Sequence, residues 1–127
     1  MGMRILLAED DNNISTIAKL ALERLGGHIV TVAHNGEVAL QMALGGGFDL
    51  ILLDEMMPKL NGLTVCKRYL SEASAPVPVI FLSAKSQDSD IREFTDLAKG
   101  YIAKPFDPMQ LNQQIAAVMA KVTGVVA

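Results

Sequence analysis

The chain has 127 residues, of which 50% are hydrophobic, and its net charge is −3. This length suffices for one domain with a hydrophobic core and leaves no room for a second folded domain. The sequence has no block rich in Lys and Arg and no apolar run of about 18 residues, so we expect neither direct nucleic-acid binding nor a membrane span.

Continuous apolar runs alternate with helical patterns along the chain. The runs predict strands whose two faces are both covered by helices, at Ile5–Ala8, Ile29–Val32, Leu50–Leu53, Val79–Leu82 and, more weakly, Gly100–Ala103. The 3.6-residue period predicts helices over Ile14–Leu25, Val38–Met42 and Leu111–Val122, and a shorter stripe predicts one over about residues 62–72. This alternation predicts a single α/β domain of five βα units around a doubly wound parallel sheet.

Polar residues and glycines indicate where the helices begin and end. We expect N-caps at Asn12 or Asn13, Asn35, Ser86 and Asp107, with Pro108 as the first helical residue after Asp107. The first helix is expected to end at Gly26-Gly27. Gly45-Gly46-Gly47 is interpreted as a flexible helix exit and not as a phosphate loop, because no Lys-Ser/Thr pair follows it.

The cysteine content and the N-terminus favour a cytoplasmic location. Cys66 cannot form an internal disulfide and has no Cys or His partner at metal-ligand spacing. Residues 1–4 lack the basic region, the long apolar stretch and the cleavage site of a signal peptide. We therefore expect a reducing environment and a buried, unreactive Cys66.

Polar residues of different chemical types follow four of the predicted strands. They are Glu9 with Asp10, Asp54, Ser83 and Lys104. In open parallel sheets, ligands bind beyond the carboxyl ends of the strands. The sequence therefore predicts that these side chains share one edge of the sheet and form a site there.

The acidic residues suit a magnesium-assisted phosphoryl transfer. Neighbouring acids repel one another unless a cation offsets them, and magnesium takes oxygen ligands, so Asp10 and Asp54 are candidate direct ligands and Glu9 a water-mediated one. Asp54 could attack phosphorus and form an acyl phosphate. Taken singly, these residues could equally be solvated loop acids or, for Asp54, a turn residue.

Donors for a phosphoryl group follow the last two strands. The Ser83 hydroxyl and the Ala84 backbone N–H could hydrogen-bond its oxygens, and the Lys104 ammonium could pair with its charge. Alternatively, Ser83 caps the next helix and Lys104 is simply solvated.

Four motifs together resemble the receiver domain of two-component response regulators, over about residues 3–121. They are Glu9-Asp10-Asp11, Asp54-Glu55-Met56-Met57-Pro58 with Gly62, Phe81-Leu82-Ser83-Ala84 and Gly100-Tyr101-Ile102-Ala103-Lys104-Pro105-Phe106. The resemblance implies a flavodoxin-like fold with strand order 2-1-3-4-5. Residues 122–127 would be a tail or the start of a linker, with no output domain in this chain.

The resemblance also implies a role for each site residue. Mg2+ would be held by Glu9, Asp10, Asp54 and the Met56 backbone carbonyl. Asp54 would be the phosphoacceptor, Ser83, Ala84 and Lys104 would bind the phosphoryl group, and Ser83 with Tyr101 would form a switch. A cis peptide bond is expected at Lys104-Pro105, and Met56 and Lys85 would influence the lifetime of the acyl phosphate.

The implied partners are proteins. A histidine kinase or a histidine phosphotransfer protein would donate the phosphoryl group, and a downstream protein would bind the face built from helix four, strand five and helix five. The chain would be a monomer or a phosphorylation-dependent dimer, and it would lose its phosphate slowly without turning over an external substrate.

Two alternatives remain open. The chain could be a receiver-like interaction module that does not use phosphorylation, although the full set of acids, Ser83 and Lys104 argues against this. It could also be a small aspartyl-phosphate hydrolase, but Met56 stands where such enzymes usually carry a second aspartate. His28 and His34 are expected to be partly exposed structural residues away from the acidic edge.

Overall fold

Five parallel strands form one sheet in the order β2-β1-β3-β4-β5. The computed structural model describes residues 2–84 and 97–122. The strands are β1 (Arg4–Ala8), β2 (Ile29–Ala33), β3 (Leu50–Asp54), β4 (Val79–Ser83) and β5 (Gly100–Ala103). The predicted doubly wound α/β fold and its strand order are confirmed. The helix expected after Ser86 lies outside the described residues.

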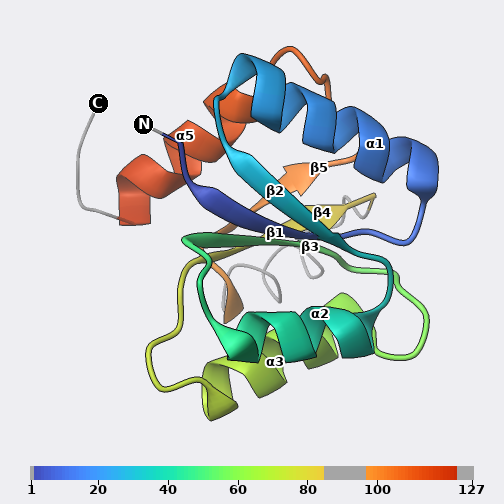
Figure 1. Cartoon of the computed structure of the whole chain (residues 1–127), viewed down its shortest axis with the longest axis vertical. Coiled ribbons are helices and arrows are strands. Elements are labelled where there is room, and N and C mark those ends of the chain that lie inside the picture. Colours follow the sequence, from blue (N-terminus) through green and yellow to red (C-terminus); the bar gives the residue numbers. More distant parts are fainter. Residues whose placement is uncertain (1, 85–96, 123–127) are drawn as a thin grey trace.

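Helices cover both faces of the sheet (Figure 1). On one face lie α1 (Asn12–Leu20), its π-helical continuation η1 (Ala21–Leu25) and α5 (Leu111–Val122), and on the other lie α2 (Gly36–Gly45) and α3 (Gly62–Glu72). Successive strand residues point to opposite faces, so Leu6 and Leu53 pack toward α2 and α3, whereas Leu7 and Leu52 pack toward α1 and α5. This double burial explains why the strand sequences are apolar without a break. Within the described residues, no helix is long and apolar enough to cross a membrane.

The N-cap of α1 is Asp11, so the expected cap at Asn12 or Asn13 was wrong. Asp11 Oδ1 accepts hydrogen bonds from the backbone N–H groups of Asn13 (2.8 Å) and Ile14 (3.1 Å). Asn12 is already the first helical residue, and a cap must precede the helix. The expected cap at Asn35 is confirmed by its bond from the Val38 N–H, at 2.9 Å.

Asp107 caps a turn that precedes α5. Its Oδ1 accepts from the Met109 N–H and its carbonyl accepts from the Gln110 N–H, both at 2.9 Å. The helix itself begins at Leu111. The prediction that Pro108 is its first residue was therefore wrong. The turn inserts three residues between the cap and the helix.

Glycines end two of the helices, as predicted. Gly27 (φ 69°) follows η1, and Gly46 (φ 81°) and Gly47 (φ 91°) follow α2, all with backbone conformations that favour glycine. The short helix predicted at about residues 62–72 is also present. It buries Cys66, and this burial raises the pKa of the thiol to about 11, which leaves little of the reactive thiolate.

Candidate functional site

The polar strand-end residues lie at the carboxyl edge of the sheet. Asp54 and Ser83 are the last residues of β3 and β4, and Glu9 and Lys104 directly follow β1 and β5. The parallel register pairs Asp54 with Leu82 and Ser83 with Ala103. The carboxyl ends of β3, β4 and β5 therefore lie side by side at the same edge of the sheet. The sheet thereby gathers residues that are up to 95 positions apart in sequence.

The Lys104 ammonium lies between two buried carboxylates. Its Nζ is 2.5 Å from Glu9 Oε1 and 3.1 Å from Asp54 Oδ1. The residues Glu9 and Asp54 are only 1% and 5% exposed, and the Lys104 side chain is 15% exposed. A buried charge is costly unless a partner offsets it, and within the described part of the chain Lys104 is the cation that pairs with these two acids.

Burial and mutual contact shift the pKa values of this cluster. Burial raises the pKa of Glu9 to about 7, since the hydrogen bond from Lys104 only partly opposes burial and the Asp54 carboxylate adds to it. For Lys104, burial alone would lower the pKa, but the Glu9 hydrogen bond and the charges of Asp54 and Glu9 outweigh it and raise the pKa above its usual value. The lysine therefore carries its positive charge at neutral pH.

Backbone groups hold the acids in place. The Asp11 N–H donates to Glu9 Oε2 at 3.2 Å, and the Met56 N–H donates to Asp54 Oδ1 at 3.3 Å. The contacts that Lys104 and the Met56 N–H make to the Asp54 carboxylate both fall on Oδ1.

Gly62 lets α3 start directly against the end of β3. Its N–H donates to the Glu55 carbonyl at 2.9 Å, and a Cβ at this position would lie 2.4 Å from the Asp54 backbone oxygen. The Glu55 N–H in turn donates to the Leu82 carbonyl at 3.1 Å, which continues the pairing of β3 with β4. The backbone that carries Asp54 is therefore fixed on both sides.

The acidic residues fit a divalent cation. Carboxylate oxygens of Glu9, Asp10 and Asp54 lie within 4.8 Å of one another, and Asp10 is exposed to solvent. An all-oxygen donor set with one open side is what Mg2+ prefers, because it keeps several of its waters. The Met56 N–H contact places the Met56 peptide next to the same carboxylate.

The remaining predicted site residues lie on β4 and β5 or directly after them. Ser83 is buried, and its carbonyl accepts from the Lys104 N–H at 2.8 Å, while Ala84 is exposed. Tyr101 is half-buried on β5 and packs against the cluster of core residues under α2 and α3. The Lys104–Pro105 bond is cis, as expected. Lys85 lies outside the described residues.

The expectation for the two histidines holds only in part. His28 is half-buried and accepts a hydrogen bond from the Met3 N–H at its Nδ1, at 2.9 Å. His34, however, follows β2 at the same carboxyl edge, and its Nδ1 lies 3.3 Å from the Glu9 backbone oxygen. The prediction that it lies away from the acidic edge was wrong, because parallel pairing brings the end of β2 level with the end of β1.

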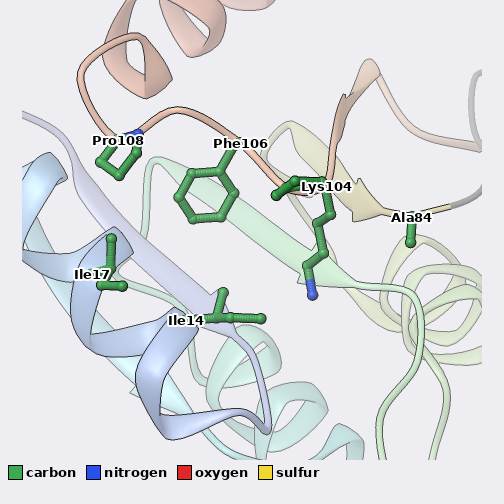
Figure 2. Close-up of a pocket in the computed structure, with 7 residues that line it drawn as sticks. Ile14, Ile17, Ala84, Lys104, Phe106 and Pro108 are labelled. Atoms are coloured by element: carbon green, nitrogen blue, oxygen red, sulfur yellow. The ribbon is translucent and has the colours of Figure 1, made fainter.

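Sequence patterns did not reveal an apolar cavity beside Lys104. Its volume is about 410 Å³, and its walls include Ile14 and Ile17 of α1 and Phe106 after β5 (Figure 2). Ile14 and Ile17 follow the helical period, which is typical of core residues, yet Ile17 is 47% exposed. The sequence feature that could have pointed to this cavity is Phe106, an aromatic residue directly after Lys104-Pro105.

Fold and site together define a doubly wound α/β protein with a carboxylate cluster, balanced by one lysine, at the carboxyl edge of its sheet. The family described as "Response regulator receiver domain" matches residues 5–116. The chain therefore belongs to the response regulator receiver domains of two-component systems.

Similar proteins agree with this assignment. The chain is 37% identical over 122 residues to the alkaline phosphatase synthesis transcriptional regulatory protein PhoP of Bacillus subtilis, covering 95% of this chain and 50% of that protein. It is 43% identical over 114 residues to the transcriptional regulatory protein DltR of Streptococcus agalactiae, covering 89% and 50%. A Francisella response regulator receiver domain superposes with a TM-score of 0.84 at 28% identity, covering 95% of this chain and 99% of that one. The chain spans about half the length of these two curated relatives.

Proposed function

We propose that Asp54 accepts a phosphoryl group from a histidine kinase or a histidine phosphotransfer protein and that the phosphorylated chain signals to another protein. The observation that carries this proposal is the Lys104 ammonium, held within 3.1 Å of the Asp54 carboxylate at the open edge of the sheet. A cation in this position can pair with a phosphoryl group as soon as Asp54 receives it.

Asp54 is the nucleophile of the proposed transfer. Because Lys104 and the Met56 N–H both contact Oδ1, we assign the attack on phosphorus to Oδ2. The new Oδ2–P bond forms as the P–N bond to the donor histidine breaks, and the imidazole leaves with the electron pair. Lys104 stays beside the transferred group and offsets its charge.

Glu9, Asp10, Asp54 and the Met56 backbone carbonyl would hold Mg2+, which supplies charge neutralisation for the phosphoryl oxygens. Ser83 and the Ala84 N–H would donate hydrogen bonds to the same oxygens. Ser83 moving toward the phosphoryl group would change the packing available to Tyr101 and reshape the face around β5 and α5.

The wider role follows from the same chemistry. The domain would span residues 3–121 and act in the cytoplasm, where a protein target binds the reshaped face. Its acyl phosphate would be lost slowly by hydrolysis, without turnover of an external substrate. Two curated relatives are named as transcriptional regulatory proteins, so control of transcription is the pathway that we favour.

Intact-mass measurement tests the proposal. The protein is incubated with Mg2+ and acetyl phosphate, beside Asp54→Ala and a control, Asp49→Ala, at the opposite end of β3. We expect the wild type and Asp49→Ala to gain the mass of one phosphoryl group and Asp54→Ala to gain none. No gain in the wild type, or an equal gain in Asp54→Ala, would contradict the assignment, and the former would favour a module that works without phosphorylation.

A further inference from the structure

An apolar cavity of about 410 Å³ opens directly beside the proposed phosphoryl site. Figure 2 shows Ile14, Ile17, Phe106 and Pro108 on one side of the Lys104 side chain and Ala84 on the other. Among the described residues that line it, Lys104 is the only charged one. This volume falls within the range of cavities that bind small molecules.

The apolar surface extends beyond this cavity. A second one, of about 290 Å³, shares Ile17 and Pro108 with it and continues along α1 and η1 past Leu20 and Leu25. Ile17, Leu20 and Leu25 are 47%, 48% and 56% exposed. Contiguous exposed apolar residues of this kind mark binding surfaces more often than scattered single ones do.

The cavity and the phosphoryl site share two residues. Ala84 and Lys104, to which the proposed function gives contacts with the phosphoryl group, both line the cavity. In the sheet, β3 lies between β1 and β4, and the cavity walls come from residues that follow β1, β4 and β5. A phosphoryl group bound at Lys104 and Ala84 would therefore direct whatever is attached to its phosphorus into the cavity.

We infer that this cavity is a leaving-group subsite that binds the apolar acyl part of small acyl phosphates. The inference rests on the proposed function. The dianionic phosphoryl group pairs with Lys104, and an aromatic or branched acyl group packs between α1 and Phe106. In the transfer, the Asp54 Oδ2–P bond forms and the P–O bond to the acyl group breaks. The carboxylate leaves with the electron pair, so no proton is needed.

Rates with two donors test the inference. Benzoyl phosphate and acetyl phosphate carry the same phosphoryl group and differ in the apolar acyl part. We expect the second-order rate of phosphorylation to be about tenfold higher for benzoyl phosphate, since its ring loses water-exposed area in the cavity. Ile17→Ala should lower the ratio of the two rates by about threefold. Ile29→Ala removes an equally apolar side chain outside the cavity, from a residue that is 61% exposed against 47% for Ile17, and it should leave the ratio unchanged.

Binding of ligands that cannot donate a phosphoryl group tests the subsite independently of phosphoryl transfer. Benzylphosphonate and methylphosphonate cannot donate a phosphoryl group, and their binding is followed by NMR at the methyl groups of Ile14 and Ile17. We expect benzylphosphonate to bind about tenfold more tightly and to shift both residues.

The outcomes of the two experiments are distinguishable. Equal rates for the two donors, with Asp54 phosphorylated by both, would overturn the subsite and leave the proposed function standing. Equal affinities of the two phosphonates would also overturn the subsite. If neither donor phosphorylates Asp54, the proposed function fails, and the phosphonate affinities then decide the subsite alone.

Discussion

Lys104 is the residue on which the site depends most. It is the shared partner of Glu9 and Asp54, at 2.5 Å and 3.1 Å. Before phosphorylation it offsets two buried carboxylates, and in the proposed phosphorylated state it would pair with the phosphoryl group as well. In this proposal one cation serves both the stability of the protein and its chemistry.

Replacing Lys104 tests this double role. In Lys104→Met the two acids lose their partner, so without Mg2+ we expect the free energy of unfolding at pH 8 to fall by about 1–3 kcal/mol. The rate of phosphorylation should fall as well. Urea unfolding in EDTA measures the first effect and intact mass against time the second.

Lys59→Met is the matched control. Lys59 pairs with Glu37 at 3.9 Å, and both side chains are more than half exposed, so its loss should change the free energy of unfolding by less than about 0.5 kcal/mol. Equal losses in the two variants would show that Lys104 is an ordinary surface lysine.

Among the elements, the junction of β3 and α3 positions Asp54. Gly62 brings the first turn of α3 against the Asp54 carbonyl, closer than any side chain allows. The sequence predicted this helix only weakly, because its apolar stripe is short. The structure adds the reason for its position: Asn61 caps it through the Thr64 N–H at 2.9 Å, and Gly62 permits the close approach.

A substitution at Gly62 should therefore disturb the site by displacing the backbone that carries Asp54. In Gly62→Ala the new Cβ meets backbone atoms of Asp54 and Glu55 at 2.4 Å and 2.9 Å, so the backbone must shift. We expect the free energy of unfolding to fall by about 1–3 kcal/mol and phosphorylation of Asp54 to slow. Urea unfolding and the rate of mass gain measure the two effects.

Gly45→Ala provides the comparison. Gly45 is the last residue of α2, and a Cβ there meets nothing within 4 Å. Alanine should leave the stability unchanged or raise it by up to about 1 kcal/mol, because it restricts the unfolded chain. A Gly62→Ala variant as stable as Gly45→Ala would mean that the close packing against Asp54 is not needed.

At the scale of the whole molecule, the sequence was sufficient for the architecture and for the edge where the site lies. Unbroken apolar runs separated by helical periods identify a parallel sheet, and parallel strands must end at a common edge. Contacts made in three dimensions were not predictable. The pairing of Lys104 with Glu9, the position of His34 beside Glu9 and the partial exposure of Ile17 depend on packing between distant segments.

Cation binding should stabilise the whole fold. A cation that binds only the native state adds about 1.4 kcal/mol to the free energy of unfolding at ten times its dissociation constant, and the melting temperature should rise by a few degrees. We expect Mg2+ to have this effect on the wild type and much less on Asp10→Asn. Glu37→Gln, an exposed acid outside the cluster, should respond like the wild type. Equal Mg2+ responses in all three proteins would contradict the metal site.

Chemical trapping of the phosphorylated residue tests directly whether Asp54 is the phosphoacceptor. The protein is incubated with Mg2+ and a phosphodonor, treated with borohydride and mapped by peptide mass spectrometry, since borohydride reduces an acyl phosphate to an alcohol. We expect conversion of Asp54 to homoserine only when donor and Mg2+ are both present. Conversion at Asp10 or Asp49 in place of Asp54, or an unchanged Asp54 in protein that has gained a phosphoryl group, would contradict it.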